Sequence, residues 1–181
     1  MRSVIPSCLI AALPLGACAS ATGPVDTAGT FFEIEYVNFA WIPTWQGAFI
    51  DPTGAIYRYD LEGSVVEGPD DEYVPAAELQ AKWQRNQEQA GQIPAGDFAQ
   101  LANLVPAAAD GTLSANRSWC ADAGTVTYRA YRYEAAHGAF RRVTLRREGD
   151  VAQRNESTAA AAIAQRLLAL DLAPRFPDCA P

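Results

Sequence analysis

The sequence predicts a single α+β domain, in which an antiparallel sheet carries about three helices packed on one face. Segments with the two-residue alternation of strands form two groups, one at the start of the domain and one at 125–154. Segments with helical spacing of apolar residues lie between these groups and after the second. Segregated strands and helices are typical of α+β folds, and residues 31–181 suffice for one hydrophobic core.

The first strand begins where apolar residues alternate with acidic ones. Phe32, Ile34 and Tyr36 fall on one face, and Glu33 and Glu35 fall on the other. This alternation predicts a half-buried strand.

A hairpin turn follows at Asp51-Pro52-Thr53-Gly54, between apolar runs at 48–50 and 55–59. Pro52 presets the backbone of the turn, and Gly54 can adopt the positive φ that closes a bulged hairpin.

The aromatic residues of this region have two interpretations. Core packing is favoured, and the alternative is a platform for a small molecule or glycan, which requires Trp41 and Trp45 to be exposed. The candidate contacts of such a platform are Trp41, Trp45, Tyr57 and Tyr59.

Three helices and a second group of strands complete the prediction. The helices are expected at 75–90 (ended by Gly91), at 94–106 (ended by Pro106) and at 157–172 (capped by Ser157). The strands are expected at 125–133, 140–148 and 151–154.

The N-terminus has the composition of an export signal. Arg2 precedes a short apolar segment at 4–15, and small residues follow it. This pattern predicts a secretory signal peptide that is too short to span a membrane. The run Leu15-Gly16-Ala17-Cys18 resembles the lipobox of bacterial lipoproteins.

The lipobox resemblance covers only about the first 18 residues and has specific implications. Residues 1–17 would be removed, and Cys18 would be acylated on its thiol and amine. Residues 18–30 would then form a lipidated spacer that reaches roughly 20 Å. Ala19 after the cysteine favours the outer membrane of a Gram-negative host, with the domain in the periplasm. Ordinary signal-peptidase cleavage near Ala17-Cys18-Ala19 or Ala19-Ser20-Ala21 remains the alternative.

The mature domain would keep two cysteines, Cys120 and Cys179. In an oxidising compartment they predict one disulfide, which contributes about 4 kcal/mol for a loop of about 60 residues. No metal or cofactor site is predicted, because the single histidine, His137, stands alone in a turn.

Charge is distributed unevenly along the chain. Residues 19–110 carry 14 acidic and 3 basic side chains, whereas residues 111–181 carry 7 acidic and 10 basic ones. The predicted hairpin at 125–148 could place Arg129, Arg142 and Arg146 on its outer face, beside Tyr131. Such a strip could contact an anionic cell-surface polymer or an acidic envelope protein. The alternative is a solvated face balanced by the acidic half. A pI near 4.7 argues against nucleic acid as a partner.

The sequence favours a protein that is not an enzyme. It contains no Gly-x-Ser-x-Gly elbow, no phosphate-binding glycine loop and no zinc-protease motif. The leading hypothesis is a lipid-anchored domain that binds or scaffolds another envelope component. The alternatives are the small-molecule or glycan-binding module and a hydrolase built on Asp51 or Asp60.

Overall fold

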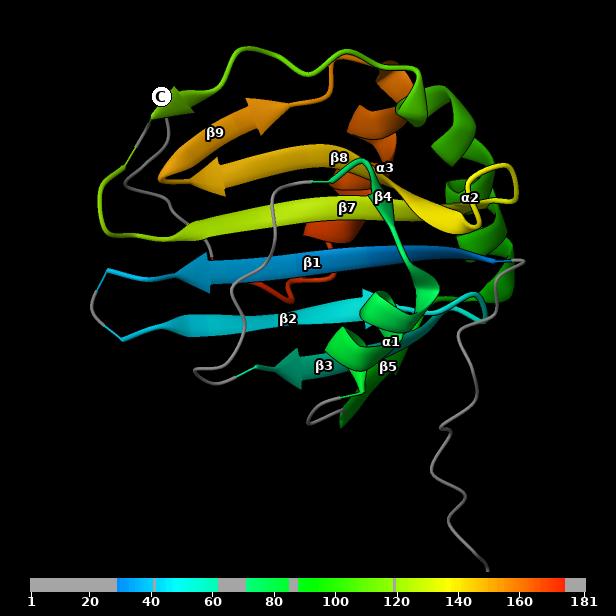
Figure 1. Ribbon diagram of the computed structural model, residues 1–181, viewed down its shortest axis with the longest axis horizontal. Helices are drawn as coiled ribbons and strands as arrows, with labels where there is room; N and C mark the ends of the chain where they lie inside the picture. The colour runs from blue at the N-terminus through cyan, green and yellow to red at the C-terminus, as the bar shows by residue number, and fades with distance from the viewer. Residues whose placement is uncertain (1–28, 41, 62–70, 85–87, 119, 175–181) are drawn as a thin grey trace, which may run out of the picture.

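The computed structural model describes residues 29–40, 42–61, 71–84, 88–118 and 120–174. Within this part of the chain, nine antiparallel strands and three helices form one domain, which confirms the α+β class (Figure 1). The strands are β1 (Thr30–Asn38), β2 (Thr44–Ile50), β3 (Ala55–Asp60), β4 (Tyr73–Val74), β5 (Glu88–Gln92), β6 (Arg117–Ser118), β7 (Thr125–Glu134), β8 (Ala139–Gly149) and β9 (Val151–Arg154). The helices are α1 (Ala76–Trp83), α2 (Ala95–Ala109) and α3 (Thr158–Leu168).

The sheet has the order β5-β3-β2-β1-β7-β8-β9-β6, and β4 pairs with β8 outside this path. The predicted β2–β3 hairpin is confirmed, with Gly54 at a φ of +84°. Asp51 Oδ1 accepts hydrogen bonds from the backbone N–H groups of Thr53 and Ala55, at 2.9 and 3.0 Å. These bonds give Asp51 a turn-forming role.

The helices cover both faces of the sheet, which corrects the expectation that all three lie on one face (Figure 1). On one face, α2 and α3 pack over Phe32 and Ile34 of β1 and over their neighbours on β7 and β8. On the other face, α1 inserts Trp83 among aromatic side chains and stacks it on Phe49 at a centroid distance of 4.8 Å. A second hydrophobic core therefore lies beneath α1.

The C-terminal ends of all three helices differ from the prediction. The first helix ends at Trp83, and Glu88–Gln92 instead form the edge strand β5 beside β3. Helix α2 continues past Pro106 to Ala109, because Val105 and Ala108 are completely buried in its last turns. Helix α3 begins at the predicted Ser157 cap but ends at Leu168. Three residues after this end, Asp171 adopts a φ of 55°.

Several predicted features lie outside the described residues: the signal peptide, Cys18, most of the spacer, Trp41 and Cys179. The disulfide between Cys120 and Cys179 therefore stays a prediction. Among the described helices, none has the length and apolarity needed to cross a bilayer.

Candidate functional site

Beneath α1 the protein buries four charged side chains, which we call the polar centre: Glu33, Glu35, Lys82 and Arg129. The side chains of Glu33 and Glu35 are 0% and 1% exposed, that of Arg129 is 4% exposed and that of Lys82 is 11% exposed. Glu33 pairs directly with Arg129 across β1 and β7, so the sheet places opposite charges side by side. Lys82 comes from α1, the helix that covers this face.

The charges of the polar centre neutralise one another. Lys82 Nζ lies 3.0 Å from Glu33 Oε1 and also donates a hydrogen bond to Glu35 Oε2. Arg129 Nη1 donates to Glu35 Oε1 and lies 3.6 Å from Glu33 Oε2. Because two carboxylates meet two cations, the centre carries no net charge, which is the condition under which buried charges are tolerated.

Aromatic side chains supply further hydrogen bonds to the two carboxylates. Tyr59 and Tyr131 donate their hydroxyl protons to Glu33, at 2.7 and 2.6 Å. The indole N–H of Trp45 donates to Glu35 Oε2 at 2.8 Å. Trp45 and Tyr59 are only 4% and 3% exposed. These two residues therefore belong to the core, which corrects their assignment to an exposed ligand platform; Tyr57 is half-buried and stacks on Phe49.

Gly47 makes the approach of Tyr59 to Glu33 feasible. It lies on β2 between Glu35 on β1 and Tyr59 on β3. A Cβ atom at Gly47 would stand 2.7 Å from the Tyr59 hydroxyl and 2.4 Å from the Ile34 carbonyl oxygen. Without a side chain at this position, the Tyr59 ring crosses β2 and its hydroxyl reaches Glu33.

The electrostatics of the polar centre keep all four charged groups ionised at neutral pH. Burial raises the pKa of Glu33 and Glu35, but the attraction of Lys82 and Arg129 outweighs it, so the pKa of each carboxyl is lowered. Burial lowers the pKa of Lys82, but the two carboxylates outweigh it and raise that pKa above its usual range.

The tyrosines of the polar centre are held protonated. Burial, and then the negative charge of Glu33, raise the pKa of Tyr59 and of Tyr131. A general acid or base works best with a pKa near the operating pH, and the pKa values of these tyrosines and of the two glutamates are displaced away from neutrality. The ion pairs of Lys82 with Glu33 and Glu35 join α1 to the sheet.

The predicted arginine strip does not form. Arg129 and Tyr131 are buried at the polar centre, and Arg142 is half-buried opposite Tyr131. Arg146 is exposed, but a register shift between Tyr128 and Arg129 places it opposite Tyr128, whose side chain packs in the core on the α2–α3 side. Because this bulge interrupts the alternation of β8, Arg146 does not share a face with Arg129.

A second feature, missed from the sequence, is the tip of the β1–β2 hairpin, at the left of the sheet in Figure 1. We define the hairpin tip by Phe39 and Ile42, whose exposed fractions are 63% and 78%. Asn38 holds its backbone, accepting from Ala40 N at 2.9 Å and donating to the carbonyl oxygen of Asp122 at 3.2 Å. The tip thus presents large apolar side chains next to a backbone segment, Asn38 and Ala40, that hydrogen bonds hold in place. The run from Val37 to Ile50 contains no charged residue, and this signal could have indicated the tip.

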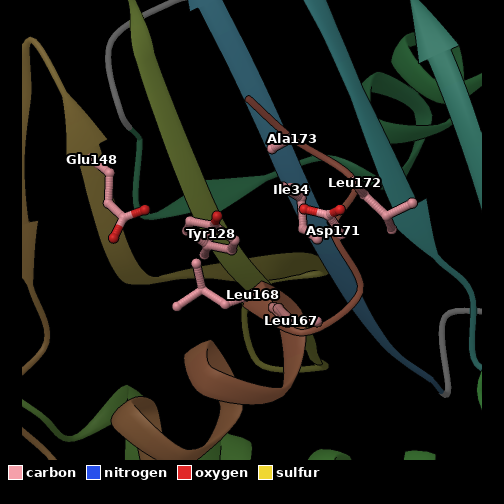
Figure 2. A pocket seen from close by; sticks show the side chains of 8 residues that line it. All are labelled: Ile34, Tyr128, Glu148, Leu167, Leu168, Asp171, Leu172 and Ala173. Atoms are coloured by element: carbon pink, nitrogen blue, oxygen red, sulfur yellow. The ribbon is translucent and has the colours of Figure 1, made fainter. Parts of the chain in front are cut away.

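A small hollow lies on the α2–α3 side of the sheet, at the C-terminal end of α3 (Figure 2). Its walls are mostly aliphatic, and Glu148 and Asp171 lie on either side of Tyr128 in this view. None of the residues predicted for a site lines it. The hollow is therefore separate from the polar centre, which lies on the α1 side, and from the hairpin tip.

His137 stacks on Tyr73 in the β7–β8 turn, with a centroid distance of 3.9 Å. Within the described ranges, no group of three or more histidine, cysteine, aspartate or glutamate residues is arranged to hold a metal ion.

Comparisons with protein-family models, with curated proteins and with solved structures find no match to the chain.

Proposed function

We propose that the chain is a lipid-anchored, non-catalytic envelope protein whose periplasmic domain binds another envelope protein through the hairpin tip. The observation that carries this proposal is the exposure of Phe39 and Ile42 beside Asn38 and Ala40, whose positions hydrogen bonds fix. Burying such a side chain contributes about 1.5–3 kcal/mol, and the fold leaves this contribution unused. Preorganisation of the loop lowers the entropy cost of binding.

The position of the hairpin tip favours a protein partner. The tip lies at the end of β1 opposite Thr30, where the chain enters the sheet from the N-terminal side (Figure 1). Nine residues of strand span about 30 Å, so the tip stands well away from the end nearest the proposed anchor. An apolar recess on a neighbouring envelope protein is the partner chemistry that suits this placement.

The anchor can be tested separately from the tip. In a Gram-negative host, we expect the mature wild-type protein to begin at an acylated Cys18, and the Cys18→Ser variant to lack the lipid. The intact mass of the protein extracted from the envelope shows both where the mature chain begins and whether the lipid is present. An unmodified wild-type chain that begins after Ala19 or Ala21 would favour ordinary signal-peptidase cleavage and overturn the proposed anchor.

The tip is tested with Phe39→Ser combined with Ile42→Ser in the full-length, anchored protein. Each side chain would contribute about 1.5 kcal/mol at a buried contact, so we expect partner affinity to fall about a hundredfold. Chemical cross-linking in intact envelopes, followed by mild detergent extraction, measures the yield of the complex.

Leu113→Ser is the matched control, because Leu113 is the third large apolar side chain exposed in the described part of the chain, at 40%. We expect this variant to retain the complex. Unfolding curves should agree among the three proteins, since surface substitutions usually change stability by less than about 0.5 kcal/mol. An undiminished complex in the double variant would exclude the tip as the contact.

A further inference from the structure

Three exposed arginines gather on adjacent strands at the β6 edge of the sheet, and we call them the arginine corner: Arg117, Arg146 and Arg154. Arg146 on β8 and Arg154 on β9 are directly opposite partners. Arg117 on β6 lies opposite Ala152, which precedes Arg154 by two residues and so shares its face. The pairing of three strands therefore brings the three arginines to one surface.

The charge of the arginine corner is only partly compensated. Arg146 forms an ion pair with Glu148, whereas Arg117 and Arg154 form none with any described residue. Like charges directly opposite on neighbouring strands are destabilising, so the pair of Arg146 and Arg154 carries an electrostatic cost.

Two other surface arginines, Arg141 and Arg166, are ion-paired, unlike Arg117 and Arg154. Arg141 lies 2.9 Å from a carboxylate oxygen of Glu72, and Arg166 lies 2.9 Å from one of Asp97. The chain as a whole has a net charge of −7, so acidic residues are abundant. What distinguishes the corner is that its arginines gather on adjacent strands, and an anion from outside the domain would offset this local positive charge.

We propose that the arginine corner binds the phosphate groups of anionic lipid headgroups at a membrane surface. Guanidinium groups match phosphate oxygens in a bidentate geometry. The three arginines lie on the surface of adjacent strands at the sheet edge. Such a surface suits several phosphate groups in one plane, as in a membrane, better than it suits a single ligand enclosed in a pocket. The arginine corner and the hairpin tip share no residue. The proposal rests on the proposed function in one respect: the lipid anchor would hold the domain close to a membrane.

Vesicle binding tests this proposal with the purified full-length Cys18→Ser protein, in which the lipid cannot mediate attachment. We expect the protein to sediment with phosphatidylcholine vesicles that contain phosphatidylglycerol, and not with phosphatidylcholine alone. Each basic side chain near an anionic lipid surface adds to the affinity for it. Removing two of them, in Arg117→Gln combined with Arg154→Gln, should therefore weaken binding to the vesicles about thirtyfold. Added salt should weaken the wild-type protein further.

Arg58→Gln combined with Arg132→Gln is the matched control, because it removes the same charge from exposed arginines on β3 and β7. We expect this control to bind as wild type does. Equal weakening of both double variants, equal binding to neutral vesicles, or no binding at all would overturn the proposal. Displacement by low millimolar inorganic phosphate would assign the corner to a free anion instead of lipid.

The hairpin-tip variant separates this inference from the proposed function. Phe39→Ser with Ile42→Ser should keep its affinity for phosphatidylglycerol vesicles while it loses the protein complex. Loss of vesicle binding in the tip variant would show that the tip, not the arginine corner, contacts lipid.

Discussion

Replacing Arg129 with methionine is expected to lower the free energy of unfolding by about 3–5 kcal/mol. The substitution removes one of the two cations of the polar centre and leaves Glu33 and Glu35, both completely buried, with Lys82 alone. The uncompensated negative charge would have to be protonated or hydrated, and either change disturbs the packing of α1. Urea denaturation followed by circular dichroism measures the loss.

The matched control for Arg129 is Arg132→Met on the same strand, where the side chain is exposed. We expect this change to alter stability by less than about 0.5 kcal/mol. Glu35→Gln combined with Arg129→Met should lose less than the sum of the single changes, because the neutral amide no longer needs the guanidinium. Equal denaturation midpoints for Arg129→Met and Arg132→Met would show that the polar centre does not stabilise the fold.

The strands and turns could be predicted because their signals are local. In the strand predicted at 125–133, two-residue alternation puts Val126, Tyr128 and Ala130 on one face, and these three residues do pack in the core under α2 and α3. The turn before β3 and the Ser157 cap of α3 were likewise found from residue type and position. Each depends on a few consecutive residues and needs no knowledge of the tertiary structure.

The polar centre could not be predicted, because alternation gives the two faces of a strand but does not show which face is covered. Glu33 and Glu35 were assigned to the polar face of a half-buried strand, and α1 buries that face. Only the pairing of β1 with β7, which sets Arg129 beside Glu33, shows that these charges neutralise one another. The pairing joins residues almost a hundred positions apart, and no local pattern contains it.

Helix propensity misled the prediction after α1. Glu88, Gln89 and Ala90 favour a helix, yet they extend along the free edge of β3. The unpaired backbone groups of that edge gain partners from β5, and this tertiary contribution outweighs weak local preferences. Pro106 was expected to end α2 for a similarly local reason, and burial of Val105 and Ala108 retains the last turn.

The polar centre also predicts unfolding at alkaline pH. The pKa values of Tyr59, Tyr131 and Lys82 are raised in the folded protein, whereas unfolded tyrosine and lysine titrate near pH 10.0 and 10.5. Stability from these groups is therefore fully present below about pH 10 and is lost as pH rises toward their folded pKa values. Each of the three groups lowers the free energy of unfolding by about 1.4 kcal/mol per pH unit in this range. Together they give a slope of roughly 4 kcal/mol per pH unit.

A domain of ordinary stability, about 5–15 kcal/mol, should then unfold between about pH 11 and 14. The phenolate absorbance of two tyrosines should rise together with the loss of circular dichroism, because both hydroxyls donate to the buried carboxylate of Glu33 until α1 leaves the sheet. Tyr131→Phe should reduce the slope by about a third, since one of the three titrating groups is gone. Complete tyrosine titration near pH 10 with an unchanged spectrum of the backbone would mean that the polar centre opens to solvent without unfolding, and α1 would then be a mobile cover over it.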